Sequence, residues 1–445
     1  MRVVYGAAAA RDAILNRPHL AEHVPPAVRE HIRRVFGEDL SVEEVVDRIL
    51  GDVRSHGDGA VREYNREIDG QADTGVPLEV PRDEIEAAYE KVDATLVEAL
   101  RAAAERIRAY HERQLEHGLR PFQDGELGQL VRPLQRAGIY VPGTQVAYPS
   151  TVLMIALPAR VAGVREVVMA TPVAPDGNVA AAKLVAADIA GVDHVYRVGG
   201  VQAIAALAYG TASIPRVDKI CGPGNIFVAT AKRRVYGDVG IDGVFGPSET
   251  LIIADDSAEP ALVAADLIAG AEHDELATAI LITTSAALAA SVQGELANQM
   301  ARIPRGEVAR TALAGQGAIA VVESLETAAE IANAFGPEHL LLHVRQPQEL
   351  LPSVSYAGCV FLGAYSVESI GDYTAGPSHV LPTSSSARFS SPLGVWDFLK
   401  VTNIVSLDGA AAERLGPPAI AIARAEGLQG HAAAIERRLA RARRE

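Results

Sequence analysis

Val167-Val168-Met169-Ala170-Thr171 is an unbroken apolar run of strand length, and the alanine-rich segment 178–189 follows it with helical character. A second pair comes next, in which 194–200 has the pattern of a strand and 201–209 that of a helix. Strands that are apolar along their whole length and alternate with helices are typical of parallel sheets covered on both faces. This stretch therefore predicts an α/β fold.

The same alternation runs through most of the chain in two sets. In the first set, 138–143 and 219–221 are further strand candidates on either side of the quoted stretch. The second set begins near residue 250, and its strand candidates are 251–254, 279–283, 318–322, 340–344 and 359–362. We interpret the two sets as two α/β units of similar build, although no sequence repeat relates them.

Residues 41–68 have the period of an amphipathic helix, interrupted by a turn at Gly57-Asp58-Gly59. Ser41 is a suitable N-cap, and Glu44 three residues later predicts a capping box. This region is therefore expected to hold two consecutive helices.

Three further regions are expected to be helical. Residues 82–117 form a second long helical region, and residues 1–35 are expected to form an arm broken at Pro18 and Pro25-Pro26. Past Pro392 we expect an appended tail of short helical pieces.

Composition excludes several classes of protein. A chain of 445 residues can bury a large core and is expected to contain more than one domain. Its net charge of -15 argues against a nucleic-acid partner, which usually needs a basic face. The one dense basic run, 437–444, is interpreted as the solvated end of a C-terminal helix.

Cysteine usage and hydropathy indicate a cytoplasmic protein. Cys221 and Cys359 are far apart, so they form neither a disulfide framework nor a cysteine zinc site. Any zinc must then be bound by His, Asp, Glu or Gln. No apolar run approaches the ~20 residues of a membrane span, and the N-terminus is a poor signal peptide, so we expect no membrane association.

Imidazoles and carboxylates recur in separate parts of the chain, and these are the groups that a zinc site or an acid/base site needs. The stretches are Ala269-Gly-Ala-Glu-His-Asp-Glu275, Pro337-Glu-His339, Gly371-Asp-Tyr373, Gly376-Pro-Ser-His379 and Glu426-Gly-Leu-Gln-Gly-His431. Each stretch by itself also has an ordinary structural interpretation.

His273 is expected on a helix from about 260 to 276. A ligand three residues earlier would share its face, but that position is Gly270, which has no side chain. Glu338-His339 stands at a loop–strand junction, where an acid and an imidazole are placed for proton transfer. Asp372 lies in a glycine-rich turn, where an aspartate most often bonds its own backbone.

Two glycine turns, Gly199-Gly200 and Gly222-Pro-Gly-Asn225, follow strands and precede helices. Such a turn lets backbone approach a phosphate-bearing cofactor at a helix N-terminus. Neither matches G-x-G-x-x-G, and tight strand–helix turns use glycine for steric reasons alone. Gln202 and Asn225 are candidates to bind such a ligand, with helix capping as the alternative.

Taken together, these residues resemble histidinol dehydrogenase over nearly the whole length, from about residue 36 to His431. The stretches that carry the resemblance are Arg136-Ala-Gly-Ile-Tyr-Val-Pro-Gly143, Tyr148-Pro-Ser-Thr-Val-Leu-Met154, Val217-Asp-Lys-Ile-Cys-Gly-Pro-Gly-Asn225, Gly246-Pro-Ser-Glu249, Ala271-Glu-His-Asp274, Pro337-Glu-His339, Gly371-Asp-Tyr373, His379-Val-Leu-Pro-Thr383, Ala387-Arg-Phe-Ser-Ser391 and Glu426-Gly-Leu428 with His431. So many ordered matches are very specific.

The resemblance implies a homodimer that oxidises L-histidinol to L-histidinal and then to L-histidine with two molecules of NAD. Zn²⁺ is implied as a second cofactor that holds the substrate through its imidazole and amine. His339 would take the alcohol proton, and Glu338 would activate the water that attacks the aldehyde. Glu426 would suit the cationic amine of the substrate, because opposite charges attract strongly in a shielded pocket.

The remaining site residues are also implied by position. The zinc ligands are His273, Asp372 and His431, the last from the partner subunit. The NAD contacts are Tyr140, Gln202 and Asn225. The substrate contacts are Ser150, Ser248, His273, His339, Asp372, His379, Glu426 and His431.

One departure from the family concerns Gly270, where the family has a glutamine that binds both zinc and substrate. Three explanations are open: water fills the position, zinc binds more weakly, or the pocket is reshaped for another substrate. We expect weaker metal retention than in a site with all four protein ligands.

The resemblance implies two incomplete Rossmann-like units with parallel-rich sheets in an intertwined homodimer. The expected domains are a helical arm (1–35), a first unit (36–139 with 249–393), a second unit (140–248) and a helical tail (394–445) that contributes to the partner's site. One alternative is a paralogue that oxidises another small polar alcohol. Another is a non-catalytic binding or scaffold protein, against which the intact Glu338-His339 pair argues.

Overall fold

The computed structural model describes residues 1–445 apart from 17–23, 25, 72–74, 144–146, 175–176 and 445. Pro18 and Pro25, expected to break the N-terminal arm, lie outside the described residues. The chain divides into two compact units, one of Met1–Glu116 with Leu134–Phe398 and one of His117–Pro133 with Leu399–Glu445. No helix of the described residues is long and apolar enough to span a membrane.

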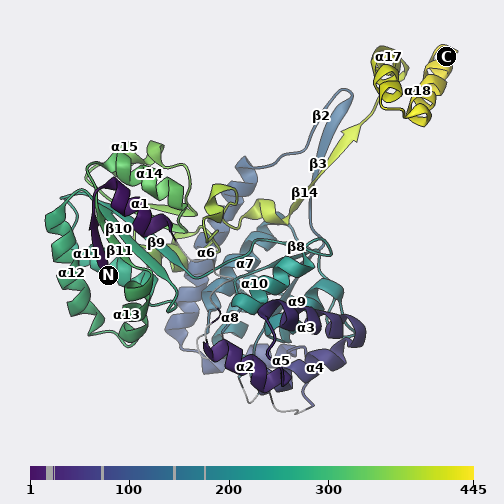
Figure 1. Ribbon diagram of the computed structural model, residues 1–445. Helices are drawn as coiled ribbons and strands as arrows, with labels where there is room; N and C mark the ends of the chain where they lie inside the picture. Colours follow the sequence, from purple (N-terminus) through teal and green to yellow (C-terminus); the bar gives the residue numbers. More distant parts are fainter. Residues whose placement is uncertain (17–23, 25, 72–74, 144–146, 175–176, 445) are drawn as a thin grey trace. The chain divides into compact units, whose positions relative to one another are not determined.

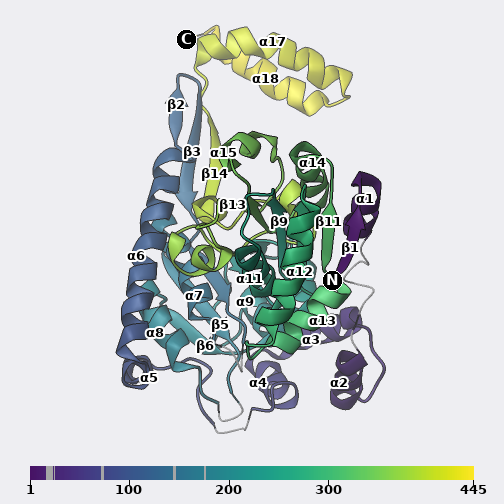
Figure 2. The ribbon, with the colours of Figure 1, turned by 90° about the vertical axis from the view of Figure 1, so that its left-hand side faces the viewer.

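The first unit contains a six-stranded sheet in which every neighbouring pair is parallel. Its order is β1 (Arg2–Tyr5), β11 (Ala318–Val321), β10 (Thr278–Thr283), β9 (Glu249–Ala254), β12 (His339–His343) and β13 (Cys359–Leu362). Helices α11 (Pro260–Ala271), α12 (Ala286–Met300) and α13 (Gly306–Gly315) cover one face, which Figure 2 views from the helix side. Helices α1 (Ala7–Leu15) and α14 (Leu325–Phe335) cover the other.

Alternation along the central strand shows why both faces of this sheet are covered. In β9, Ile252 packs with α11 to α13, whereas Leu251 and Ile253 pack with α1 and α14. Because successive strand residues point to opposite faces, a continuous apolar run buries a side chain on each. The second set of strand candidates is thus confirmed as one parallel sheet.

A five-stranded parallel sheet forms the rest of the core of the first unit (Figure 1). Its order is β6 (His194–Arg197), β5 (Glu166–Thr171), β4 (Arg136–Tyr140), β7 (Lys219–Cys221) and β8 (Gly240–Ile241). Helices α7 (Pro149–Ala162) and α8 (Ala181–Ala190) pack together beside it. Helices α9 (Gly200–Tyr209), α10 (Ile226–Val235) and α3 (Val42–His56) share a buried cluster with β5 and β7.

The remaining elements of the first unit are mostly helical. They are α2 (Pro26–Phe36), α4 (Asp58–Glu67), α5 (Arg82–Ala88), a 3-10 turn (Tyr89–Lys91), α6 (Ala94–His117), α15 (Pro347–Leu350), a 3-10 turn (Leu351–Ser353), α16 (Glu368–Ile370), a π-helical turn (Gly371–Ala375) and two 3-10 turns (Ser386–Arg388 and Val395–Phe398). The predicted capping box is present at the start of α3, where Ser41 and Glu44 bond each other's backbone N–H groups. Helix α3 packs on α9. The four-part domain division as a whole stays a prediction.

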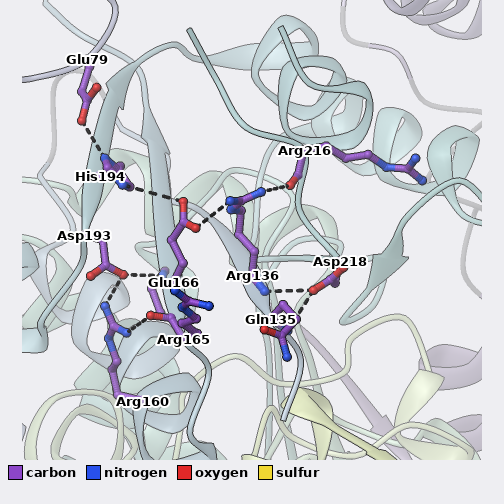
Figure 3. A network of polar contacts seen from close by, with 11 residues as sticks. Glu79, Gln135, Arg136, Arg160, Arg165, Glu166, Asp193, His194, Arg216 and Asp218 are labelled. Carbon is purple, nitrogen blue, oxygen red and sulfur yellow. Dashed lines mark hydrogen bonds and ion pairs between the residues drawn. The ribbon is translucent and has the colours of Figure 1, made fainter. Parts of the chain in front are cut away.

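A network of hydrogen bonds and ion pairs joins the amino ends of β4, β5 and β6 (Figure 3). Arg136 donates to Glu166 at 2.6 Å and to the carbonyl of Arg216 at 2.8 Å, while Asp218 accepts from the backbone N–H of Arg136 at 2.9 Å. Asp193 likewise accepts from the N–H of Val167 at 2.7 Å. These contacts hold the strands in register at the sheet edge opposite to the carboxyl ends, so they are structural.

The second unit is an antiparallel sheet with a helical hairpin. Strands β14 (Leu399–Val405), β3 (Leu127–Pro133) and β2 (Phe122–Asp124) pair in that order, and α17 (Gly409–Ala425) packs against α18 (Gln429–Ala442). Two expectations are therefore wrong in part: the tail contains a strand, and the N-terminal arm begins with β1. Both are edge strands that are held by pairing with residues more than 250 positions away in the chain.

Candidate active site

Glu338 and His339 stand where β12 begins, directly after the turn that ends α14. Their side chains are buried, and the Glu338 carboxylate accepts from the backbone N–H of Glu249 at 2.9 Å. Since Glu249 is the first residue of β9, the pair lies at the amino ends of two neighbouring strands of the six-stranded sheet. The sequence prediction of an acid and an imidazole at a loop–strand junction is confirmed.

Two carboxylates face His339 from the short helical segment that follows β13. The Nδ1 atom of His339 is 3.7 Å from Glu368, and its Nε2 atom is 3.5 Å from Asp372. Neither ring nitrogen makes a hydrogen bond to any described residue. The ring therefore has two buried polar atoms available to a ligand.

Glu368 is the residue of this cluster that the sequence analysis missed. It is in α16, and Asp372 is in the π-helical turn that continues it. Residues four apart on a helical segment share a face, so the spacing Glu-x-x-x-Asp was the signal that could have identified it. π-Helical turns are frequent at functional sites.

His273 is not on a helix, which corrects the prediction. Helix α11 ends at Ala271 with Glu272 as its C-cap. Asp274 then organises a turn, because its side chain accepts from the N–H of Leu276 at 2.8 Å. The turn leaves His273 exposed, with one potential ligand atom each on His273, Glu368 and Asp372 lying within 4.8 Å of one another.

His379 connects this cluster to helix α7. Its Nδ1 atom is 2.9 Å from the backbone carbonyl of Asp372, and its Nε2 atom is 3.2 Å from the Thr151 hydroxyl. Ser150 precedes Thr151 in the first turn of α7, and Ser248 directly precedes β9. These two predicted substrate contacts are thus chain neighbours of Thr151 and Glu249, which bond His379 and Glu338. Their contact with substrate stays a prediction.

Burial and charge set the protonation of the cluster. Burial raises the pKa of Glu338 to about 8. For His339, burial acts to lower the pKa, but the charges of Glu368, Glu338 and Asp372 outweigh it and raise the pKa to about 10. Burial also raises the pKa of Glu368, whereas the neighbouring His339 ring overcomes burial and lowers the pKa of Asp372.

The cluster has the donors that a divalent cation requires. Two carboxylates and one imidazole converge, and among the described residues Glu368 and Asp372 form ion pairs with His339. Buried carboxylates are normally paired or bind metal, and imidazole with carboxylate suits zinc. The residues present therefore fit the metal that the sequence analysis expected, with Glu368 in addition.

The predicted cofactor contacts gather near the carboxyl ends of the five-stranded sheet. Tyr140 ends β4, and its hydroxyl accepts from the N–H of Gly200 at 3.1 Å. Gln202 is fully buried and donates to Asn65 and Asp69 at 3.2 and 3.0 Å, while its Oε1 atom has no hydrogen bond to a described residue. The Oε1 atom of Gln202 can therefore accept a hydrogen bond from a ligand.

Asn225 and the turn before it have a clear structural role. The Asn225 side chain caps α10 by accepting from the N–H groups of Phe227 and Val228. At Gly222, with φ +126°, a Cβ would be 2.1 Å from the backbone oxygen of Tyr140. The steric explanation of this turn is therefore correct.

Glu426 and His431 are in the second unit. Glu426 is the C-cap of α17, His431 is in the first turn of α18, and both are exposed. Several large apolar side chains of the same unit are exposed as well, among them Phe122, Leu127, Val405, Ile422 and Leu428.

Comparisons with known proteins identify the family of this chain. A family model described as histidinol dehydrogenase matches residues 33–439. A histidinol dehydrogenase of Deinococcus radiodurans is 49% identical over 442 residues, covering 99% of this chain and 100% of the relative. One of Methylococcus capsulatus is 51% identical over 405 residues, covering 90% of this chain and 93% of the relative. The crystal structure of histidinol dehydrogenase from Elizabethkingia anophelis matches with a TM-score of 0.86 and 32% identity, covering 99% of this chain and 98% of that one.

Proposed function

This chain belongs to the histidinol dehydrogenase family of oxidoreductases, and we propose that it oxidises L-histidinol through L-histidinal to L-histidine with two molecules of NAD. The observation that carries the proposal is the buried Glu338-His339 pair, whose imidazole faces two carboxylates and makes no hydrogen bond to a described residue through either nitrogen. The alternative of a paralogue with another substrate is not favoured, because about half of all residues are identical to relatives named for histidinol over nearly the whole chain. The two free cysteines suit the reducing cytoplasm, where we place the enzyme.

The metal site would be formed by His273, Asp372 and Glu368. When bound, Zn²⁺ supplies a positive charge that fixes and polarises the substrate. A bound cation would offset the negative charges of Asp372 and Glu368 and would so favour the neutral form of the His339 imidazole, which a general base requires.

The acid and the imidazole divide the two oxidation steps. His339 accepts the hydroxyl proton as the alcohol becomes an aldehyde. Glu338, whose pKa burial raises to about 8, can hold or release a proton near neutral pH. It therefore takes the proton of the water that adds to the aldehyde.

The strand order supports a dinucleotide site at the five-stranded sheet. In chain order, β4 is the first strand; β5 and β6 extend the sheet on one side, and β7 and β8 on the other. In Rossmann-like sheets, ligands bind at the carboxyl ends of the strands where this order reverses. Tyr140 and the turn to Asn225 follow the two strands at that point, and Gln202 offers its unpaired acceptor nearby.

We further propose a homodimer in which His431 and Glu426 of the second unit complete the partner's site. The exposed apolar side chains of that unit support a partner surface. A site completed by the other chain would make the dimer obligatory for activity.

The proposal is tested by NADH formation with L-histidinol, with added Zn²⁺ and with a chelator. Metal-dependent turnover that yields about two NADH per histidinol is the expected result, since each of the two oxidations passes one hydride to NAD. Loss of histidinol turnover in protein that still binds NAD and Zn²⁺ would refute the substrate.

A further inference from the structure

Position 270 has no room for any side chain. Gly270 is buried in the last turn of α11, and a Cβ there would be 2.1 Å from the Oγ1 atom of Thr250 and 2.8 Å from its Cβ. Both distances are too short for real Cβ contacts, and Thr250 is a fully buried residue of the central strand β9. The space that a side chain at position 270 would need is thus filled by the threonine.

The atom that fills this space also holds Glu368. The Thr250 hydroxyl donates to Oε2 of Glu368 at 2.7 Å, and the Oε1 atom of the same carboxylate is 3.7 Å from Nδ1 of His339. The side chain of Glu368 is 2% exposed, so its orientation is fixed by these contacts. A buried carboxylate beside Asp372 has a high desolvation cost, and one hydroxyl donor and one imidazole offset only a small part of it.

We propose that Glu368 is a metal ligand, beside His273 and Asp372, and that it supplies the donor that position 270 does not. One potential ligand atom of each residue already lies within 4.8 Å of the others. The four-residue spacing of Glu368 and Asp372 directs both carboxylates to one side of their helical segment. Thr250 acts as a positioning residue for this ligand.

The donor set has a chemical consequence. Two carboxylates neutralise the charge of a divalent cation, whereas a set with one carboxylate and a neutral amide leaves one positive charge uncompensated. Since the Glu368 carboxylate is buried, this difference favours tight binding. The weaker metal retention expected from Gly270 alone is replaced by the expectation of firm retention.

The test uses the full-length protein and does not depend on turnover. Zn²⁺ affinity is measured by competition with a chromophoric chelator for the wild type and for Glu368→Gln, Thr250→Val and Glu275→Gln. The last variant removes the same charge from an exposed residue near His273 that is outside the cluster. Co²⁺ is then substituted and its visible d–d absorption recorded, because this absorption reports the number and kind of ligands.

We expect Glu368→Gln to weaken Zn²⁺ binding roughly 100-fold and to change the Co²⁺ absorption. Thr250→Val should weaken Zn²⁺ binding about 10-fold and leave the Co²⁺ absorption as in the wild type. Glu275→Gln should match the wild type. Unchanged Co²⁺ absorption in Glu368→Gln would overturn the inference, whether or not affinity falls, because it shows that Glu368 is outside the coordination sphere. The inference rests on the metal site of the proposed function. A wild-type protein that binds no metal would refute that site itself. If the wild type binds metal and Glu368→Gln binds it unchanged, only the role of Glu368 as a ligand is refuted.

Discussion

Lys183 is a fully buried lysine, and its replacement by methionine tests how burial of this ammonium group makes the stability of the protein depend on pH. It lies in α8, and its ammonium donates to the Gly143 carbonyl at 2.6 Å and to the Thr171 hydroxyl at 2.8 Å. No described carboxylate forms an ion pair with it. Burial therefore lowers the pKa of Lys183 from its ordinary 10.5 to about 8.

The lowered pKa sets a magnitude and a sign. The unfolded chain holds this proton more tightly than the folded protein, so raising the pH between the two pKa values favours the folded state. The full effect is roughly 3 kcal/mol, and about 2 kcal/mol of it falls between about pH 7.5 and pH 10. Lys183→Met lacks the titrating group and should lose this gain.

The assay is urea unfolding of the wild type and Lys183→Met at a series of pH values and equal protein concentration. The difference in free energy of unfolding should shift by about 2 kcal/mol in favour of the wild type as the pH rises over that interval. Exposed Lys91→Met serves as the control and should differ from the wild type by a constant amount. A pH-independent difference for Lys183→Met would refute the reasoning, because the folded protein would then bind this proton as tightly as the unfolded chain.

Three further predictions concern the packing around Gly270, the Glu338-His339 pair and a buried ion pair beside the Gly222 turn. Gly270→Ala should destabilise the protein by about 2 kcal/mol or more in thermal unfolding, because its Cβ meets a buried threonine, whereas Gly294→Ala in an open helix position should stabilise it by about 0.5 kcal/mol; equal effects would contradict the clash. His339→Asn should abolish alcohol oxidation in stopped-flow assays, while Glu338→Gln should mainly slow aldehyde oxidation, and equal losses of both steps in both variants would contradict the division of roles. Asp242→Asn breaks the buried ion pair with Lys232, in which Asp242 accepts from the Gly222 N–H and Lys232 donates to the Gly222 carbonyl. It should lower the free energy of unfolding by about 3 kcal/mol in urea and weaken NAD binding in calorimetry. A variant as stable as the wild type would show that the pair is dispensable.

The strands could be predicted because their signal is local. Val167–Thr171 and the later runs are buried on both faces, so every residue is apolar and the segment is recognisable without its neighbours. The capping box at Ser41 is equally local, since both of its hydrogen bonds join residues three apart. The α/β fold with parallel sheets follows from such signals alone.

The features that were missed depend on distant contacts. Strand β1 pairs with β11, and β14 pairs with β3, so their conformation is decided by residues far along the chain. The end of α11 at Ala271 depends on Asp274 capping its own turn. Glu368 was missed for a similar reason, because nothing in its own stretch shows that Thr250 bonds its carboxylate.

Helix α7 contacts elements of both regions that the proposed active site would use, the cofactor edge of one sheet and the residue cluster beside the other. Its first turn follows β4, whose carboxyl end carries Tyr140 and the proposed cofactor edge. From the same turn, Thr151 contacts His379, which in turn contacts the backbone of Asp372 at the amino-end cluster of the six-stranded sheet. Hydride transfer requires the reacting carbon and the cofactor to lie in contact. Helix α7 contacts β4, and Thr151 and His379 join α7 to Asp372 by hydrogen bonds, so a change at Thr151 should misplace substrate and cofactor relative to each other without touching either.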